Sequence, residues 1–330
     1  MPTRRTLLKC SVAFGLSEFG AVGSAFAESS TGATHMDWPG LIKPPLLANG
    51  LYKHKVSDQY DAQGRAGVNR SGFQYIEEQR QGAEWVVRGA ATGQAEWKAL
   101  GWKILDWGLR QQKRDGSFGS RDPFHSTSLF LESLGRALLV DKSAADERRL
   151  SGLARGLDWQ RDTGASKSAL LHNLPYTHRR YILAAAFGHG GRLTGNREFA
   201  ATAAGWARDG LSLQRDDGEN PEAGGFDASY QMVGALMALR YMVALDDDKL
   251  LSALKAMLRK AVARELRDMA PDGNISMAGS SRIGRETTRA GVVKQVSYGE
   301  VVQALVMGAQ LLPESKWLDP AERIVRRQRW

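Results

Sequence analysis

Cysteine is almost absent from this 330-residue sequence, in which Cys10 is the only one. A single thiol excludes any disulfide within the chain, and after residue 10 it excludes a cysteine nucleophile and a thiolate metal site. The His-Glu-x-x-His pattern of zinc enzymes and the spacing of calcium-binding loops are also missing. We therefore expect a fold stabilised by its hydrophobic core, and an activity that needs no metal or other cofactor.

The sequence also lacks an apolar run long enough to cross a membrane, which takes about 20 residues. The apolar stretch over residues 11–26 is shorter and is interrupted by polar side chains. Arg4 and Arg5 precede this stretch, and residues 25–27 (Ala-Phe-Ala) end it with the small-x-small pattern of a cleavage site. Residues 1–27 thus resemble a bacterial twin-arginine (Tat) signal peptide. The resemblance implies a periplasmic or secreted protein that is not bound to the membrane after cleavage.

Long runs of like charge are missing, although the formal net charge is +9. Residues 1–27 contribute only two of these positive charges, so the remaining chain is basic and favours an anionic partner. Lysine and arginine are scattered, whereas nucleic-acid-binding proteins usually carry a basic stripe within a known module. We therefore expect no nucleic acid as partner, and an acidic polysaccharide instead.

Strict alternation of apolar and polar residues, which marks half-buried strands, is missing as well. Residues 28–70 are rich in glycine, proline and serine, so we expect an extended arm there. From Phe73 onward, apolar residues recur at helical spacing, and glycines around His189 indicate a helix exit. The spacing predicts five helical hairpins, over residues 74–91 with 94–112, 126–140 with 144–161, 175–188 with 196–213, 227–245 with 249–268, and 297–311 with 319–329.

One pattern recurs near the ends of these hairpins: a glutamine followed closely by an aspartate and a glycine. Copies lie at residues 112–116, 160–164 and 214–218, and a fainter one closes at 271–273. The copies are about 50 residues apart, which is the length of one helical hairpin with its connections. Glycine tolerates the left-handed conformation that ends a helix, and aspartate stabilises the turn. The repeat therefore predicts stacked helical hairpins.

This ending, clearest over residues 112–118, resembles the loops of (α/α) toroids, the helical rings of glycoside hydrolases, polysaccharide lyases and terpene cyclases. The resemblance implies an all-α fold: an (α/α) toroid, or an incomplete helical barrel, of five to seven helical hairpins. Its catalytic domain would span residues 71–330. In such folds the loop joins an outer helix to the next inner helix, and the substrate cleft lies where the inner helices begin.

Polar residues of catalytic types gather at the starts of the expected inner helices, and one lies in the long loop over residues 270–296. Several helix N-termini that point to one cleft would favour an anion there. The candidates for substrate binding are Asn173, Arg179, Arg180, His125, Asp227, Gln231, Arg282 and Tyr298. The candidates for catalysis are His178, Tyr176, Tyr230 and His172.

Exported toroid lyases cleave uronate-containing glycans by β-elimination, and the resemblance implies that reaction here. Asn173 and Arg179 would bind the carboxylate, while Tyr176, His178 or Tyr230 would move protons. Simpler interpretations stay open, because a histidine such as His125 or His172 can be a buried structural residue. Asp227 can likewise be only a helix cap.

Two other functions remain open from the sequence. An inverting glycoside hydrolase needs two separated carboxylates, and Glu219, Glu222 and Asp227 are the best candidates for them. A non-catalytic glycan-binding protein of an exopolysaccharide system needs no turnover at all. The lyase remains the preferred prediction.

Overall fold

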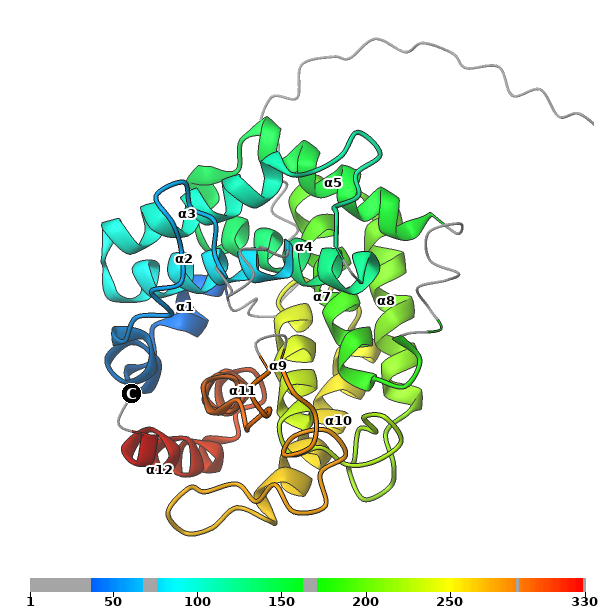
Figure 1. The fold of residues 1–330 in the computed structure, drawn as a ribbon. Helices are drawn as coiled ribbons and strands as arrows, with labels where there is room; N and C mark the ends of the chain where they lie inside the picture. Colours follow the sequence, from blue (N-terminus) through cyan, green and yellow to red (C-terminus); the bar gives the residue numbers. More distant parts are fainter. Residues whose placement is uncertain are drawn as a thin grey trace, which may run out of the picture. The chain divides into compact units, whose positions relative to one another are not determined.

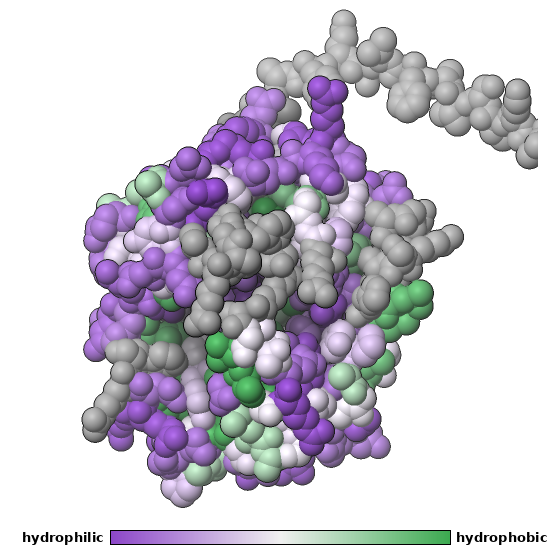
Figure 2. Space-filling view, viewed as in Figure 1, coloured by the Kyte–Doolittle hydropathy of each residue, from purple (hydrophilic) through white to green (hydrophobic). Residues whose placement is uncertain are grey.

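The computed structural model describes residues 37–67, 76–120, 122–162, 171, 173–288 and 291–328 (Figure 1). The described residues belong to one compact unit built from α-helices. The predicted signal peptide over residues 1–27 lies outside the described residues. No helix among the described residues is long and apolar enough to cross a membrane. Polar side chains dominate the face of the molecule shown in Figure 2.

All five predicted helical hairpins are confirmed, and each connection falls within a few residues of its predicted position. The pairs are α2 (Gln81–Thr92) with α3 (Ala95–Arg110), α4 (Pro123–Val140) with α5 (Glu147–Arg161), α7 (Thr177–Thr194) with α8 (Arg197–Ser212), α9 (Tyr230–Met242) with α10 (Asp248–Leu266), and α11 (Tyr298–Leu311) with α12 (Leu318–Gln328).

The first helix of each hairpin lies inside and the second lies outside (Figure 1). The inner helices α2, α4, α7, α9 and α11 contact one another in that order. Inner helices are buried on all sides, and in α9 every residue from Gln231 to Met242 is buried. Outer helices bury one stripe, as α10 does with Leu250, Leu254 and Leu258 at four-residue spacing. These burial patterns distinguish the two layers.

Three short helical segments close the ring between its first and last inner helices. They are α1 (Trp38–Ile42), η1 (Leu46–Gly50) and η2 (Leu51–Lys53). Both α1 and η1 contact α2 and α11. The N-terminal segment therefore completes the helical layer that five hairpins leave open.

The expectation of an extended arm over residues 28–70 is wrong for residues 37–53. Asp37 caps α1 by accepting from the backbone N–H of Gly40, and Pro39 occupies the first turn, where proline is compatible with a helix. Trp38 and Leu41 are buried in the main core. The prolines that suggested an extended chain therefore begin short helices.

The repeated Asp-Gly pairs end outer helices as expected. Gly116, Gly218 and Gly273 have φ angles of 89°, 93° and 85°, in the left-handed region that favours glycine. A Cβ at Gly116 would overlap the backbone carbonyl of Arg155 on the following outer helix. Each turn thus requires glycine both for its backbone conformation and for its close contact with the next hairpin.

The glutamine of the repeat joins consecutive outer helices. The Nε2 of Gln112 donates to the carbonyl oxygens of Gly116, at 3.1 Å, and of Gly152 on α5, at 2.9 Å. The Nε2 of Gln214 donates in the same way to Gly218, at 3.3 Å, and to Met257 on α10, at 3.0 Å. The side-chain amide therefore binds its own turn to the next hairpin.

We predict that Gly116→Ala lowers the free energy of unfolding by about 3 kcal/mol, because the left-handed backbone and the contact with Arg155 are both strained. Gly93→Ala is the matched control, since Gly93 has a φ of 75° and a Cβ there would meet no atom within 4 Å. That control should cost only about 1 kcal/mol. Urea unfolding of the two variants measures the difference, and equal losses would contradict the proposed contact.

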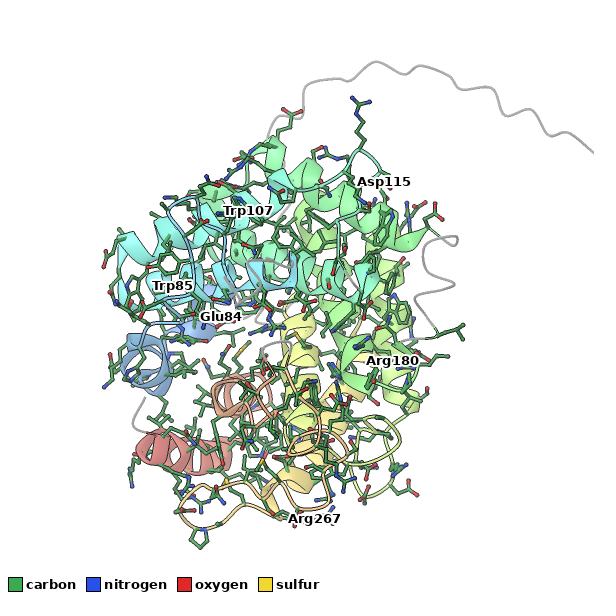
Figure 3. All side chains as sticks on the ribbon, in the orientation of Figure 1. Glu84, Trp85, Trp107, Asp115, Arg180 and Arg267 are labelled. Atoms are coloured by element: carbon green, nitrogen blue, oxygen red, sulfur yellow. The ribbon has the colours of Figure 1, made fainter. Side chains whose placement is uncertain are left out.

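Buried charges connect the inner helices near the centre of the ring. Glu132 and Arg136 lie one turn apart on α4, with 3.0 Å between the Oε1 of Glu132 and the Nε of Arg136. Arg136 also pairs with Glu84 of α2 at 3.0 Å, and Arg240 of α9 pairs with the same Glu84 at 3.3 Å. Figure 3 shows Glu84 toward the interior and Asp115 at the periphery. The ion pairs therefore join three inner helices, α2, α4 and α9.

Two further inner helices reach this network. An Nη2 of Arg240 donates to Gln303 of α11 at 3.1 Å, and His189 of α7 lies 3.1 Å from the carbonyl oxygen of Arg240. The helix exit predicted around His189 is wrong, because α7 continues to Thr194 and ends at Gly195, which has a φ of 71°. The glycines before it allow close helix packing, as at Gly188, where a Cβ would meet the ring of Tyr241.

We predict that Glu132→Gln lowers the free energy of unfolding by about 3 kcal/mol at pH 7, because it leaves buried guanidinium groups without their partner. Burial alone favours protonation, but Arg136 and Arg240 outweigh it and lower the pKa of Glu132 from 4.5 to about 2. Its stabilising contribution is therefore complete above pH 4.5 and disappears as the pH falls toward 2.

Urea unfolding at several pH values measures this effect. The difference between wild type and Glu132→Gln should shrink below pH 4.5, whereas the exposed control Glu96→Gln should differ little from wild type at any pH. A difference that is independent of pH would contradict an ionised Glu132.

Candidate functional site

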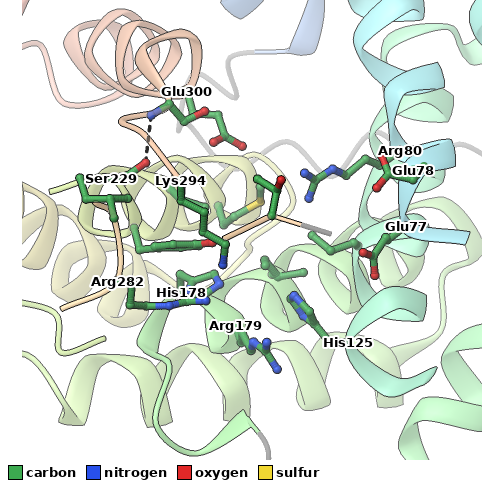
Figure 4. A pocket seen from close by; sticks show the side chains of 18 of the residues that line it. Glu77, Glu78, Arg80, His125, His178, Arg179, Ser229, Arg282, Lys294 and Glu300 are labelled. Carbon is green, nitrogen blue, oxygen red and sulfur yellow. Dashed lines mark hydrogen bonds between the residues drawn. The ribbon is translucent and has the colours of Figure 1, made fainter. Parts of the chain in front are cut away.

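A cavity of about 610 Å³ lies where the inner helices begin (Figure 4). Its described lining comes from Gln59 and Gly67, from the turn η3 (Ile76–Arg80), from the amino-terminal parts of α4, α7 and α11, from α9, and from the loop that precedes α11. The charged residues of that lining are the cations Arg80, Arg179, Arg282 and Lys294 and the acids Glu77, Glu78, Asp122 and Glu300. The amino ends of the inner helices thus meet at one charged cavity.

His178, in the first turn of α7, is fixed by a fully buried glutamate. The Nδ1 of His178 lies 2.7 Å from the Oε2 of Glu222, and its backbone N–H donates to Oε1 at 2.8 Å. Glu222 lies in the loop before α9 and does not line the cavity, whereas His178 does. The pairing therefore orients the imidazole so that its other nitrogen, Nε2, can face the cavity.

Burial determines the protonation of this pair. It raises the pKa of Glu222 to about 8, despite the backbone N–H of His178 and the guanidinium group of Arg282. Burial, followed by the charges of Arg282 and Arg179, lowers the pKa of His178 well below 6.5. Below about pH 8 the protonated Glu222 donates to Nδ1, and Nε2 carries the ring proton. Above that pH Nδ1 donates to the carboxylate, and Nε2 becomes a proton acceptor.

Two more rings line the cavity beside His178. The ring of Tyr230, at the start of α9, lies 4.6 Å from that of His178, and the ring of His125, at the start of α4, lies 6.3 Å away. The Nδ1 of His125 is buried without a hydrogen-bond partner in the described part of the chain. Burial and the charge of Arg179 lower the pKa of His125 well below 6.5. Three proton-carrying side chains thus share one wall.

Cationic groups pack on the tyrosine faces. The guanidinium carbon of Arg282 lies 3.8 Å from the ring centre of Tyr230, and the Nζ of Lys294 lies 5.5 Å from the same centre. Arg282 and Arg179 each lie 4.4 Å from the ring centre of Tyr176. Stacking of this kind holds cations in place while leaving charge available to an anion.

Asp227 anchors the loop that carries Arg282. Its Oδ1 accepts from the backbone N–H groups of Ser229 and Tyr230, at 3.1 and 2.9 Å. Its Oδ2 accepts from those of Arg282 and Ile283, at 2.9 and 2.8 Å. Because its carboxylate is fully buried and used in this way, Asp227 positions the cavity wall and does not contact a ligand.

The structure brings together five of the predicted site residues. His125, His178, Arg179, Tyr230 and Arg282 all line the cavity. His172 lies outside the described residues. The other predicted residues do not line the cavity: Asn173, Tyr176, Arg180, Asp227, Gln231 and Tyr298. Their positions differ from the prediction that they contact substrate.

Asn173, Tyr176 and Arg180 support the start of α7. The Oδ1 of Asn173 accepts from Arg179 at 2.9 Å, and the ring of Tyr176 contacts two guanidinium groups. Arg180 pairs with Asp209 at 2.7 Å and donates to the carbonyl oxygens of Asn173 and Tyr176. These contacts turn the side chains away from the cavity and stabilise the segment that carries His178.

Gln231 and Tyr298 stabilise loops through their polar groups. Gln231 accepts from the backbone N–H of Asn220 at 2.9 Å and donates to the carbonyl oxygen of Gly218 at 2.8 Å. The hydroxyl of Tyr298 accepts from Ile275 at 3.1 Å and lies 3.1 Å from the Oδ1 of Asn274. Both residues are therefore structural at the helix starts that they occupy.

The sequence interpretation missed other parts of the site. It suggests Glu222 only as a hydrolase acid, because the contact of Glu222 with His178 spans 44 positions of the chain. Arg80 and Glu78 carry no local signal, whereas Glu300 lies at the predicted start of an inner helix but was not among the candidates. No group of three or more His, Cys, Asp or Glu that could hold a metal ion occurs among the described residues.

Comparison with known proteins supports the fold. No protein-family model matches the sequence, and no curated protein matches it either. Among solved structures, the chain is similar to a glycosyl hydrolase family 88 protein from Bacteroides vulgatus, with a TM-score of 0.57. The two are 11% identical, and the similarity covers 89% of this chain and 86% of that chain. This chain therefore has the all-α, (α/α) toroid fold that its repeated loops predicted.

We predict that His178 changes tautomer, and not charge, near pH 8. Its Nε2 should carry the proton below pH 8 and lose it above, because Glu222 titrates at about 8 while burial keeps the imidazole neutral. Nitrogen-15 NMR of the imidazole measures both tautomers directly. In Glu222→Gln the change near pH 8 should disappear. A doubly protonated imidazole at pH 7 in the wild type would contradict this assignment.

Proposed function

We propose that this protein is an exported enzyme that cleaves an acidic, uronate-containing polysaccharide by β-elimination at this cavity. The observation that carries the proposal is the convergence of His178, Tyr230 and three cations on one wall. The twin-arginine pattern of the sequence supports a periplasmic or secreted location. The basic net charge supports an anionic substrate.

The reaction needs three contributions, and each has a candidate group. Arg179, Arg282 and Lys294 would neutralise the uronate carboxylate and so stabilise the charge that develops when the C5 proton leaves. Above about pH 8 the Nε2 of His178 would remove that proton, because the ionised Glu222 then accepts from Nδ1 and leaves Nε2 as the acceptor. The hydroxyl of Tyr230 would donate a proton to O4.

The bond changes balance without a further reactant. The electron pair of the C5–H bond forms the C4=C5 double bond, and the C4–O4 bond breaks. O4 leaves with the proton from Tyr230, while His178 keeps the C5 proton. Proton exchange with solvent then returns both side chains to their starting protonation states. The products are one chain with a new hydroxyl end and one with an unsaturated uronate end.

A glycoside hydrolase is the second candidate, because carboxylates also line the cavity. The acids that the sequence favours for this role do not line it: Asp227 is bound by backbone amides, Glu222 holds His178, and Glu219 pairs with Arg215 at 2.5 Å. Hydrolysis would need two of the lining acids, such as Asp122 and Glu300, with a water molecule between them.

A panel of uronate-containing glycans distinguishes the candidates. We expect ultraviolet absorbance of the unsaturated product to rise together with reducing ends, because β-elimination makes both. Reducing ends without absorbance would indicate a hydrolase and contradict the lyase. Binding without either signal would indicate a non-catalytic glycan-binding protein.

On an active glycan, His178→Ala and Tyr230→Phe should each lower kcat by about 100-fold or more, since each removes a proton-transfer group. His54→Ala is the control, because His54 lies outside the cavity lining. Undiminished turnover in both cavity variants would exclude this wall as the catalytic site.

A further inference from the structure

The charges that line the cavity are divided between two sides. On one side, Arg282 is held by both carboxylate oxygens of Glu286, at 3.0 Å each, and Lys294 lies 2.6 Å from the same carboxylate. Arg179 lies 3.4 Å from Asp122 on this side. A third acid, Glu222, lies 3.5 Å from Arg282, but burial raises the pKa of Glu222 to about 8. We call Arg179, Arg282 and Lys294 the cationic side.

On the opposite side of the cavity, acidic side chains outnumber cationic ones. Arg80 projects into the cavity from η3, and Glu300 faces it from the start of α11 (Figure 4). Arg80 interacts electrostatically with Glu300 first and next with Glu78. Glu77 interacts with Arg80 as well, so one guanidinium group faces three carboxylates. We call Glu78 and Glu300, with Arg80, the acidic side.

Both acids are held in place by the fold. Gly67 packs on the side chain of Glu78 so closely that a Cβ would meet its Cγ at 2.5 Å, and Gly67 has a φ of 72°. Glu300 lies in the first turn of α11, where the helix dipole favours a carboxylate. That helix start is attached to α9 by the backbone N–H of Ser297, which donates to the Oγ of Ser229 at 3.0 Å.

The geometry points to a second subsite on the acidic side, which accepts an uncharged or cationic sugar next to the uronate and excludes a second uronate. This inference rests on the proposed function, which places a uronate on the cationic side. Carboxylates accept hydrogen bonds from sugar hydroxyls and from ammonium groups, whereas a second carboxylate would meet like charge in a confined space. The preferred substrate would therefore alternate uronate with a hexosamine or another uncharged sugar.

Three oligosaccharides of equal length test the inference by calorimetry with His178→Ala, which keeps the glycan intact. The first alternates glucuronate with N-acetylglucosamine, the second is the same chain after removal of its acetyl groups, and the third is oligogalacturonate. We expect the first two to bind about tenfold or more tightly than the third, because like-charge contact disfavours the homopolymer. Tighter binding of the second than of the first would show that the subsite prefers an ammonium group.

Charge-removing variants test the residues themselves. Glu78→Gln and Glu300→Gln, made in the same background, should each strengthen oligogalacturonate binding several-fold and weaken binding of the deacetylated chain. Glu96→Gln, an exposed acid on α3, should change neither. Equal or tighter binding of oligogalacturonate by the parent protein would overturn the subsite and leave the proposed function standing. Failure of every uronate glycan to bind would overturn both.

Discussion

The carboxylate of Asp227 is the interaction on which the cavity depends. Each oxygen accepts two backbone N–H groups, so one buried charge joins the start of α9 to the loop that carries Arg282. Four backbone donors that no sheet or helix satisfies are thereby paired, and a buried carboxylate is stabilised by them. The relative positions of Tyr230 and Arg282 follow from this contact, since both residues are bonded to it through their own backbones.

The inner helices perform different tasks at their two ends. At their amino ends, ionisable side chains surround an open cavity. Further along the same helices, Glu132, Arg136 and Arg240 form ion pairs that bury their charges. Met237 lines the cavity, and its sulfur lies 3.7 Å from Arg240, so the two polar regions are separated by about one side chain. A change in helix packing would therefore affect both regions together.

The hairpins could be predicted because helical periodicity and the glycine of a repeated turn are local properties of the chain. Where the prediction was wrong, a local signal had two physical meanings. Pro39 disfavours a helix interior but is compatible with a first turn, and Asp37 before it supplies the cap. Gly188 can end a helix, yet here its missing side chain admits the ring of Tyr241 from a neighbouring helix. Only the tertiary packing decides between such meanings.

The candidate site could likewise be predicted only where local properties of the chain determine it. His178 and Tyr230 were found because each begins an inner helix, a position that the hairpin pattern determines. Whether a polar side chain at such a start faces the cavity depends on loops that fold back from distant positions. Glu222 illustrates this, since its loop brings a buried carboxylate to a histidine 44 positions earlier. Burial then raises the pKa of that carboxyl group to about 8, so the loop determines which nitrogen of His178 carries the proton at neutral pH.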